Sequence, residues 1–173
     1  MAWRAAKSLL VLRDQINALS PNRSKVSDGL VGDPDHASRS SDHNPWVKDG
    51  KTGIVTALDI TDDEKHGIDS LAVGEALRRS RDARIKYIIA DGQIANAKSV
   101  TKKGKTYQAW EWTSYTGKNS HHHHVHVSVQ PQKKLYDDTS QFDLSGFTVA
   151  PSKAAKPVTK PADPGLSLGA KGP

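Results

Sequence analysis

The fold of this chain is best approached from the segment His121-His122-His123-His124-Val125-His126-Val127-Ser128-Val129. From His124 onward, polar residues alternate with valines, which is the pattern of a β-strand with one buried face. His124, His126 and Ser128 then share one face, and the valines point into a core. Affinity tags lie at chain ends, whereas this histidine run is internal. The segment therefore predicts a core strand over residues 125–129, with a start as early as His123.

Other apolar and β-branched runs predict the partners of this strand. Asp91-Gly92 is a strong signal for a two-residue hairpin turn, and a second hairpin is expected around Lys102-Lys103-Gly104-Lys105. The further predicted strands are residues 54–61, 84–90, 93–97 and 107–112. Hairpins join antiparallel neighbours, so these strands predict a small, mainly antiparallel sheet.

Helical periodicity predicts two helices that flank the sheet. The first covers residues 3–19 and ends at Ser20-Pro21, and the second covers residues 68–80, where Gly74 weakens it. Strands that pair antiparallel beside a few helices indicate an α+β fold.

The composition limits the classes of site. The chain has 173 residues and no cysteine, so disulfide scaffolds, cysteine-bound zinc and thiol nucleophiles are excluded. Any metal must therefore be held by histidine or carboxylate side chains. The net charge is +6, but no stripe of basic and aromatic residues accompanies it, which disfavours nucleic acid as a partner.

The chain divides by composition near Phe147. Residues 1–147 are expected to form one folded domain, and residues 148–165 a disordered linker rich in Pro, Lys and Ala. Residues 166–173 resemble the start of a peptidoglycan-binding module that is cut short. No apolar run is long enough for a membrane span, and Leu9–Leu12 is too short for a secretory signal.

Three residues are candidate metal ligands. Asp59 lies in an otherwise apolar strand, where a carboxylate needs a partner or a metal. His43 lies in a long loop over residues 22–52, and a loop of that length within a domain is usually functional. Together with His126 they would supply two imidazoles and one carboxylate, which matches a catalytic zinc site with one open position. Asp42 is a candidate acceptor for an imidazole N–H.

Ser41-x-His43, Ala57-x-Asp59 and His121-x-x-His124-x-His126 resemble the signature of the lysostaphin and D-Ala-D-Ala metallopeptidase superfamily. Within it, the chain is most similar to peptidoglycan D-Ala-D-Ala carboxypeptidases and phage L-alanyl-D-glutamate endopeptidases. The resemblance covers residues 30–130. It implies one Zn²⁺ per chain, in a cleft on the sheet, bound by His43, Asp59 and His126.

The resemblance also implies the remaining site residues. His124 would act as general base with help from His121, and Arg39 would neutralise charge on the tetrahedral intermediate. Two departures stand out: the interval of residues 44–58 is longer than in the family, and His123 stands where one branch has a glutamate base. A loop insertion explains the first, and a histidine base is expected from the second.

These observations predict a zinc peptidase that cuts the peptidoglycan stem peptide, as in phage endolysins. The chain is expected to be a monomer without membrane insertion, made in the bacterial cytoplasm and released to the cell wall by a holin. The alternative is a non-catalytic, zinc-stabilised module that binds cell wall. A small nuclease with clustered histidines is a third, disfavoured interpretation.

Overall fold

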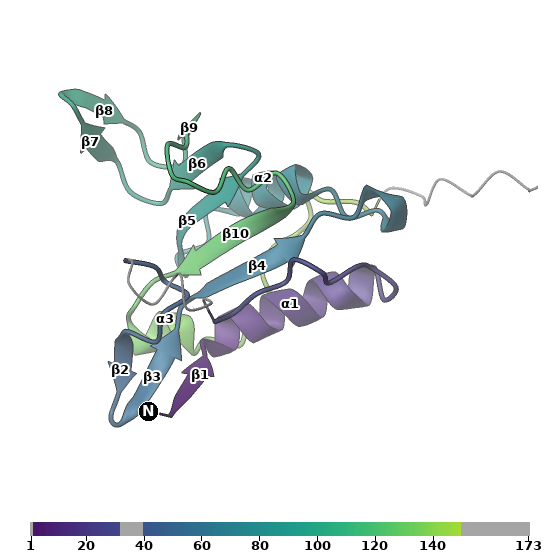
Figure 1. Cartoon of the computed structure of the whole chain (residues 1–173), viewed down its shortest axis with the longest axis horizontal. Coiled ribbons are helices and arrows are strands. Elements are labelled where there is room, and N and C mark those ends of the chain that lie inside the picture. The colour runs from purple at the N-terminus through teal and green to yellow at the C-terminus, as the bar shows by residue number, and fades with distance from the viewer. Residues whose placement is uncertain (1, 32–39, 150–173) are drawn as a thin grey trace, which may run out of the picture.

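The computed structural model describes residues 2–31 and 40–149, and the chain is α+β in this part (Figure 1). Its main sheet has five strands in the order β4-β10-β5-β6-β9, all paired antiparallel. These strands are β4 (Ala57–Thr61), β10 (His124–Val129), β5 (Ile85–Ala90), β6 (Gln93–Asn96) and β9 (Trp112–Ser114). The predicted fold class is confirmed at this level.

The histidine-rich strand β10 lies inside the sheet, between β4 and β5. Val125, Val127 and Val129 are fully buried in the core. The helices α1 (Lys7–Leu19) and α2 (Ser70–Ser80) contribute to the same core, α1 beside β4 and α2 behind β10 and β5 (Figure 1). The helices thus cover the valine face of β10, and the histidine face turns away from them.

A second sheet of three short strands accounts for two errors in the sequence prediction. It has the order β1-β3-β2, from β1 (Trp3–Ala5), β3 (Thr52–Val55) and β2 (Val47–Asp49). Residues 3–5 are therefore a strand and not the first turn of the helix. The strand predicted over residues 54–61 is broken at Thr56, whose N–H donates to the carbonyl of Asp42 (3.0 Å).

Both predicted hairpins are present, and the second extends away from the body of the molecule (Figure 1). It consists of β7 (Val100–Lys102) and β8 (Lys105–Tyr107). The strand predicted over residues 107–112 is wrong, because β8 ends where it should begin and Trp110 has a φ of 64°. The short helices η1 (Glu64–His66) and α3 (Lys133–Tyr136) were not predicted.

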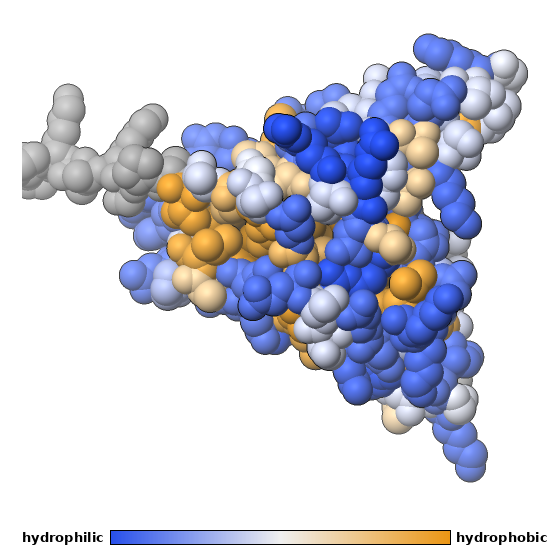
Figure 2. Space-filling model, turned by 180° about the vertical axis from the view of Figure 1, so that it is seen from behind, coloured by the Kyte–Doolittle hydropathy of each residue, from blue (hydrophilic) through white to orange (hydrophobic). Residues whose placement is uncertain are grey.

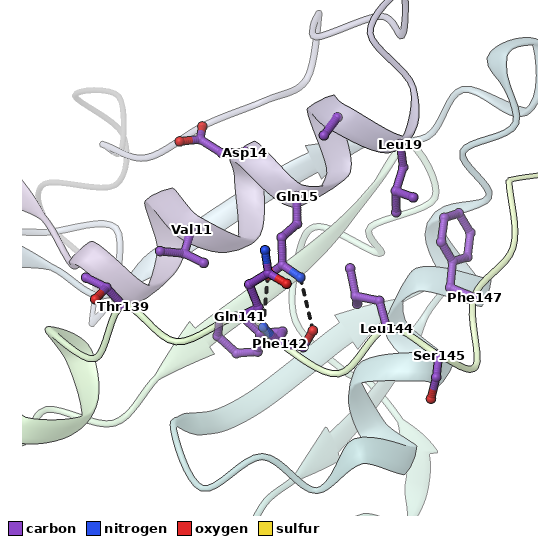
Figure 3. Close-up of a pocket in the computed structure, with 11 residues that line it drawn as sticks. Val11, Asp14, Gln15, Leu19, Thr139, Gln141, Phe142, Leu144, Ser145 and Phe147 are labelled. Atoms are coloured by element: carbon purple, nitrogen blue, oxygen red, sulfur yellow. Dashed lines mark hydrogen bonds between the residues drawn. The ribbon is translucent and has the colours of Figure 1, made fainter.

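The segment after α3 packs back onto α1. The side-chain amide of Gln15 donates to the carbonyl of Phe142 (3.0 Å) and accepts from its N–H (2.8 Å) (Figure 3). Phe142 and Phe147 are buried by this contact. The expected linker and truncated module lie outside the described residues, apart from residues 148 and 149.

Most of the rear face is hydrophilic, with one apolar region towards its left side (Figure 2). No helix among the described residues combines the length and apolar character that crossing a membrane requires.

Candidate metal centre

The strand register places the first imidazole and the carboxylate side by side. His126 in β10 pairs directly with Asp59 in β4. Its Nδ1 atom lies 2.9 Å from Asp59 Oδ1. Both side chains stand on the face of the sheet that the helices leave uncovered, as the alternation of β10 predicts.

His43 reaches the same point from the segment that precedes β2. The backbone of this loop is fixed by the Thr56–Asp42 hydrogen bond, and Asn44 N–H donates to the Ser41 carbonyl (3.0 Å). His43 Nε2 lies 3.3 Å from Asp59 Oδ2 and 3.2 Å from His126 Nδ1. The structure thus brings together the three predicted ligands.

The ligand atoms of His43, Asp59 and His126 all lie within 4.8 Å of one another, so the group could hold a metal ion. His43 and His126 are 5% exposed. Two imidazole nitrogens and a carboxylate oxygen suit zinc, and other divalent transition metals as well.

Hydrogen bonds within this group shift the pKa values of Asp59 and His43. Burial alone would raise the pKa of the Asp59 carboxyl, but hydrogen bonds from His126 and His43 outweigh it and hold that pKa far below its usual range. Burial lowers the pKa of His43, yet the hydrogen bond and charge of Asp59 raise it overall. The carboxylate is therefore ionised at neutral pH, as a metal ligand must be.

The other nitrogens of the two ligand imidazoles have partners that orient the rings. His43 Nδ1 lies 2.7 Å from the carbonyl of Leu30, and His126 Nε2 lies 2.9 Å from Ser128 Oγ. The ring of Tyr87 stacks on His126 at 5.4 Å between centroids. Such partners fix the tautomer and orientation of metal ligands. Asp42 does not take this role, because it forms an ion pair with Lys86 (2.8 Å).

His121 and His124 extend the cluster. Their ligand atoms form a second group with Asp59 within 4.8 Å, and their rings lie 4.9 Å apart. His121 Nδ1 and His124 Nε2 are buried and have no hydrogen-bond partner among the described residues. Burial lowers the pKa of both imidazoles, that of His121 to about 4, so both are neutral at pH 7.

The position of His121 is set by an unusual backbone conformation and two hydrogen bonds made by its backbone. Its φ is 57°, in the left-handed region that residues other than glycine adopt rarely. Its N–H donates to the side chain of Asn119 (3.0 Å), and its carbonyl accepts from Asp91 N–H (3.0 Å). The Asp91-Gly92 turn thus holds the backbone of His121 in place by a hydrogen bond. His122 and His123 point outward and are exposed.

A cavity of about 290 Å³ opens beside the cluster. Its wall adds residues that sequence reasoning did not assign to the site, and the local sequence gives no signal for them: Ser40, Tyr87, Ile89, Lys118 and Asn119. Tyr115 also lines the cavity and contacts His121 edge to face, with 5.3 Å between the ring centroids. Arg39 lies outside the described residues.

A second hollow of about 660 Å³ lies between α1 and residues 139–147 (Figure 3). It is lined mostly by apolar side chains, including Val11, Leu19 and Leu144, with Asp14 as its single titratable residue among the described part of the chain. This groove offers no catalytic or metal-binding set, so the chemistry of the molecule is concentrated at the histidines.

Comparison with known proteins leaves the family open: no protein-family model, curated protein or solved structure matches this chain.

Proposed function

We propose that this chain is a zinc-dependent peptidase that hydrolyses a peptide bond in the peptidoglycan stem peptide. One observation carries the proposal: a group of two buried imidazoles, His43 and His126, and the half-buried Asp59 lies beside His121 and His124, two neutral imidazoles that each have one buried nitrogen without a hydrogen-bond partner among the described residues, and a cavity opens next to the group. A purely structural metal site would not need the two additional imidazoles. The choice of peptidoglycan rests on the sequence resemblance described above.

The residues present fit a zinc ion. His43, Asp59 and His126 would hold it, because three protein ligands of the N,N,O type leave a position open for catalysis. When bound, zinc polarises a carbonyl group and makes water more acidic.

The chain's own residues supply the proton transfers. His124 Nε2 has no hydrogen-bond partner among the described residues and lies 3.7 Å from Asp59 Oδ2, and His124 is assigned to take a proton from the attacking water and return it to the leaving amine. His121 is assigned to assist His124, and the centroids of the two rings lie 4.9 Å apart. Stabilisation of the tetrahedral intermediate is assigned to Arg39.

The first experiment is mass spectrometry of purified peptidoglycan digests. It compares untreated protein, chelator-treated protein and chelated protein with zinc restored. New fragments that vanish with chelator and return with zinc are expected, and their masses identify the bond. No fragments from any wall type, with zinc still bound, would favour the binding module. Plasmid degradation that follows zinc content would favour the nuclease.

The variant His124→Ala tests the assignment of the base. It is expected to lower turnover by about 10²–10⁴-fold, the usual contribution of a general base, while zinc content stays unchanged. His123→Ala is the matched control, because His123 is the exposed neighbour on the same segment. Full activity of His124→Ala would remove the histidine base from the mechanism.

A further inference from the structure

Two buried imidazole nitrogens in the cluster have no hydrogen-bond partner within the part of the chain that the structure describes. His121 and His124 are only 6% and 9% exposed, and the unpaired atoms are His121 Nδ1 and His124 Nε2. A buried polar atom left without a hydrogen bond destabilises the folded protein. His124 Nε2 lies 3.7 Å from Asp59 Oδ2, and one ligand atom from each of Asp59, His121 and His124 lies within 4.8 Å of the others, so all three side chains could bind one shared ligand.

Asp59 is placed to serve two groups at once. Its Oδ1 faces His126, while its Oδ2 lies between His43 (3.3 Å) and His124 (3.7 Å). A carboxylate with two oxygens can bridge two cations, and paired metal ions in proteins lie about 3.5–4 Å apart. His121 and His124 offer the second cation the same donor types that His43 and His126 offer the first.

We propose that the chain has a second divalent-cation site, formed by Asp59, His121 and His124, and that Asp59 is shared between the two ions. The donor set of two imidazoles and a carboxylate points to zinc or a similar transition metal.

The second site binds more weakly than the first. His43 and His126 are oriented by Leu30 and Ser128, whereas among the described residues the His124 Nε2 atom has no hydrogen-bond partner and the ring of His121 has only the backbone of Asn119. Loss of such an orienting partner typically costs about 10–100-fold in metal affinity. The ions therefore bind in order, and the second ion arrives at higher zinc concentration.

Occupation of this site has a consequence that rests on the proposed function. An imidazole that ligates a metal through its lone pair cannot accept a proton through it. If His124 is the base, zinc above the level that fills the first site inhibits peptidoglycan cleavage.

The test measures zinc stoichiometry by native mass spectrometry and calorimetry on the full chain. The background variant His122→Gln/His123→Gln removes the two exposed histidines, which could bind zinc at the surface. In this background two zinc ions per chain are expected, with dissociation constants at least about tenfold apart.

Three substitutions then assign the ions. His121→Asn, chosen because asparagine tolerates a left-handed φ, and His124→Gln should each lose the weaker ion and keep the tighter one. His43→Gln should lose the tighter ion. Asp59→Asn should weaken both, which only a shared ligand explains.

One zinc at saturation in the background variant would overturn the inference, as would a second zinc that survives both His121→Asn and His124→Gln. The proposed function fails separately: two ions with this pattern and no cleavage of any peptidoglycan leave the second site standing, whereas cleavage by a protein that binds only one ion at saturating zinc refutes the second site alone.

Discussion

Asp59 is the residue on which the whole cluster depends. It stands in β4 between Leu58 and Ile60, both buried, so its carboxylate leaves the core only by pointing to the opposite face of the sheet. On that face it meets imidazoles from a loop and from β10. A single carboxylate thereby joins segments that are far apart in the sequence.

The raised pKa of His43 predicts how zinc binding depends on pH. Burial works against protonation, but Asp59 favours it and the pKa of His43 rises above 6.5 in the metal-free protein. Zinc must displace this proton, so its affinity is highest above the raised pKa and is lost as pH falls through it. We expect zinc content, measured by elemental analysis after dialysis, to fall together with activity towards pH ~6. Activity that persists at pH 5 after zinc is lost would contradict a metal mechanism.

Ser128 predicts a measurable effect from a residue that does not itself bind the metal. Its hydroxyl lies 2.9 Å from His126 Nε2 and is fully buried. Ser128→Ala removes the group that orients this ring, and zinc affinity should fall about 10–100-fold in a calorimetric titration. Ser8→Ala is the matched control, a fully buried serine in α1 whose hydroxyl has no partner. Equal zinc affinities of the two variants would show that Ser128 does not orient the ligand.

At the scale of elements, β3 connects the small sheet to the metal loop through a close contact. A Cβ atom at Gly53 would lie 2.6 Å from the carbonyl oxygen of Pro45, two residues after His43. Gly53→Ala must therefore push the loop away from the sheet. Overpacking of this kind costs about 1–3 kcal/mol, and zinc affinity should fall as well.

Gly74 supplies the control for this substitution. It lies inside α2, and a Cβ there would meet Val125 and its neighbours at 3.4 Å or more, which is at the edge of ordinary contact. Gly74→Ala gains about 1 kcal/mol of helix propensity, so we expect an equal or higher melting temperature by circular dichroism. A Gly53→Ala protein as stable as Gly74→Ala would show that the loop is not held by this contact.

The elements that sequence could predict are those whose signal is local. The alternation of β10 and the Asp91-Gly92 turn need only neighbouring residues, and both are present. The break at Thr56 depends on hydrogen bonds to Asp42 and Val129, which are distant in the chain, so nothing within residues 52–61 reveals it. Likewise Trp3–Ala5 becomes a strand because it pairs with β3, a tertiary contact that overrides the helical period.

The candidate site divides in the same way. His43, Asp59 and His126 were predicted as ligands because side-chain types and their spacing carry that signal, and the structure brings them together. The Leu30 carbonyl that orients His43 is a backbone group, which every residue has, so no sequence pattern marks it. The sequence analysis proposed Asp42 as the acceptor for an imidazole N–H, because a sequence reveals carboxylate side chains but does not show which backbone carbonyl will lie beside a ring.

For the molecule as a whole, the candidate ligands come from three parts of the chain. His43 belongs to the loop that leads into the small sheet, and Asp59 and His126 belong to neighbouring strands of the main sheet. A metal ion bound there ties the loop to the sheet, and the ligand set exists only when all three parts are folded. Metal binding is therefore coupled to folding.

This coupling predicts that zinc raises the melting temperature. A ligand that binds only the folded chain adds about 2.7 kcal/mol at a concentration 100 times its dissociation constant. One kcal/mol corresponds to about 2–4 °C for a domain of 150–250 residues, so the expected rise is at least about 5 °C. The unfolded chain also offers zinc the run His121–His124, which would reduce the rise by binding the unfolded state.

The informative experiment is therefore calorimetry with and without zinc in the His122→Gln/His123→Gln background, where the unfolded chain binds zinc less well. The rise should be larger there than in the unmodified chain, and His43→Gln should abolish most of it. A rise that is smaller in the background variant would mean that the exposed histidines, and not the buried group, account for the stabilisation. The two results separate binding to a folded site from binding to a flexible histidine run, because only a folded site gains when the competing ligands of the unfolded state are removed.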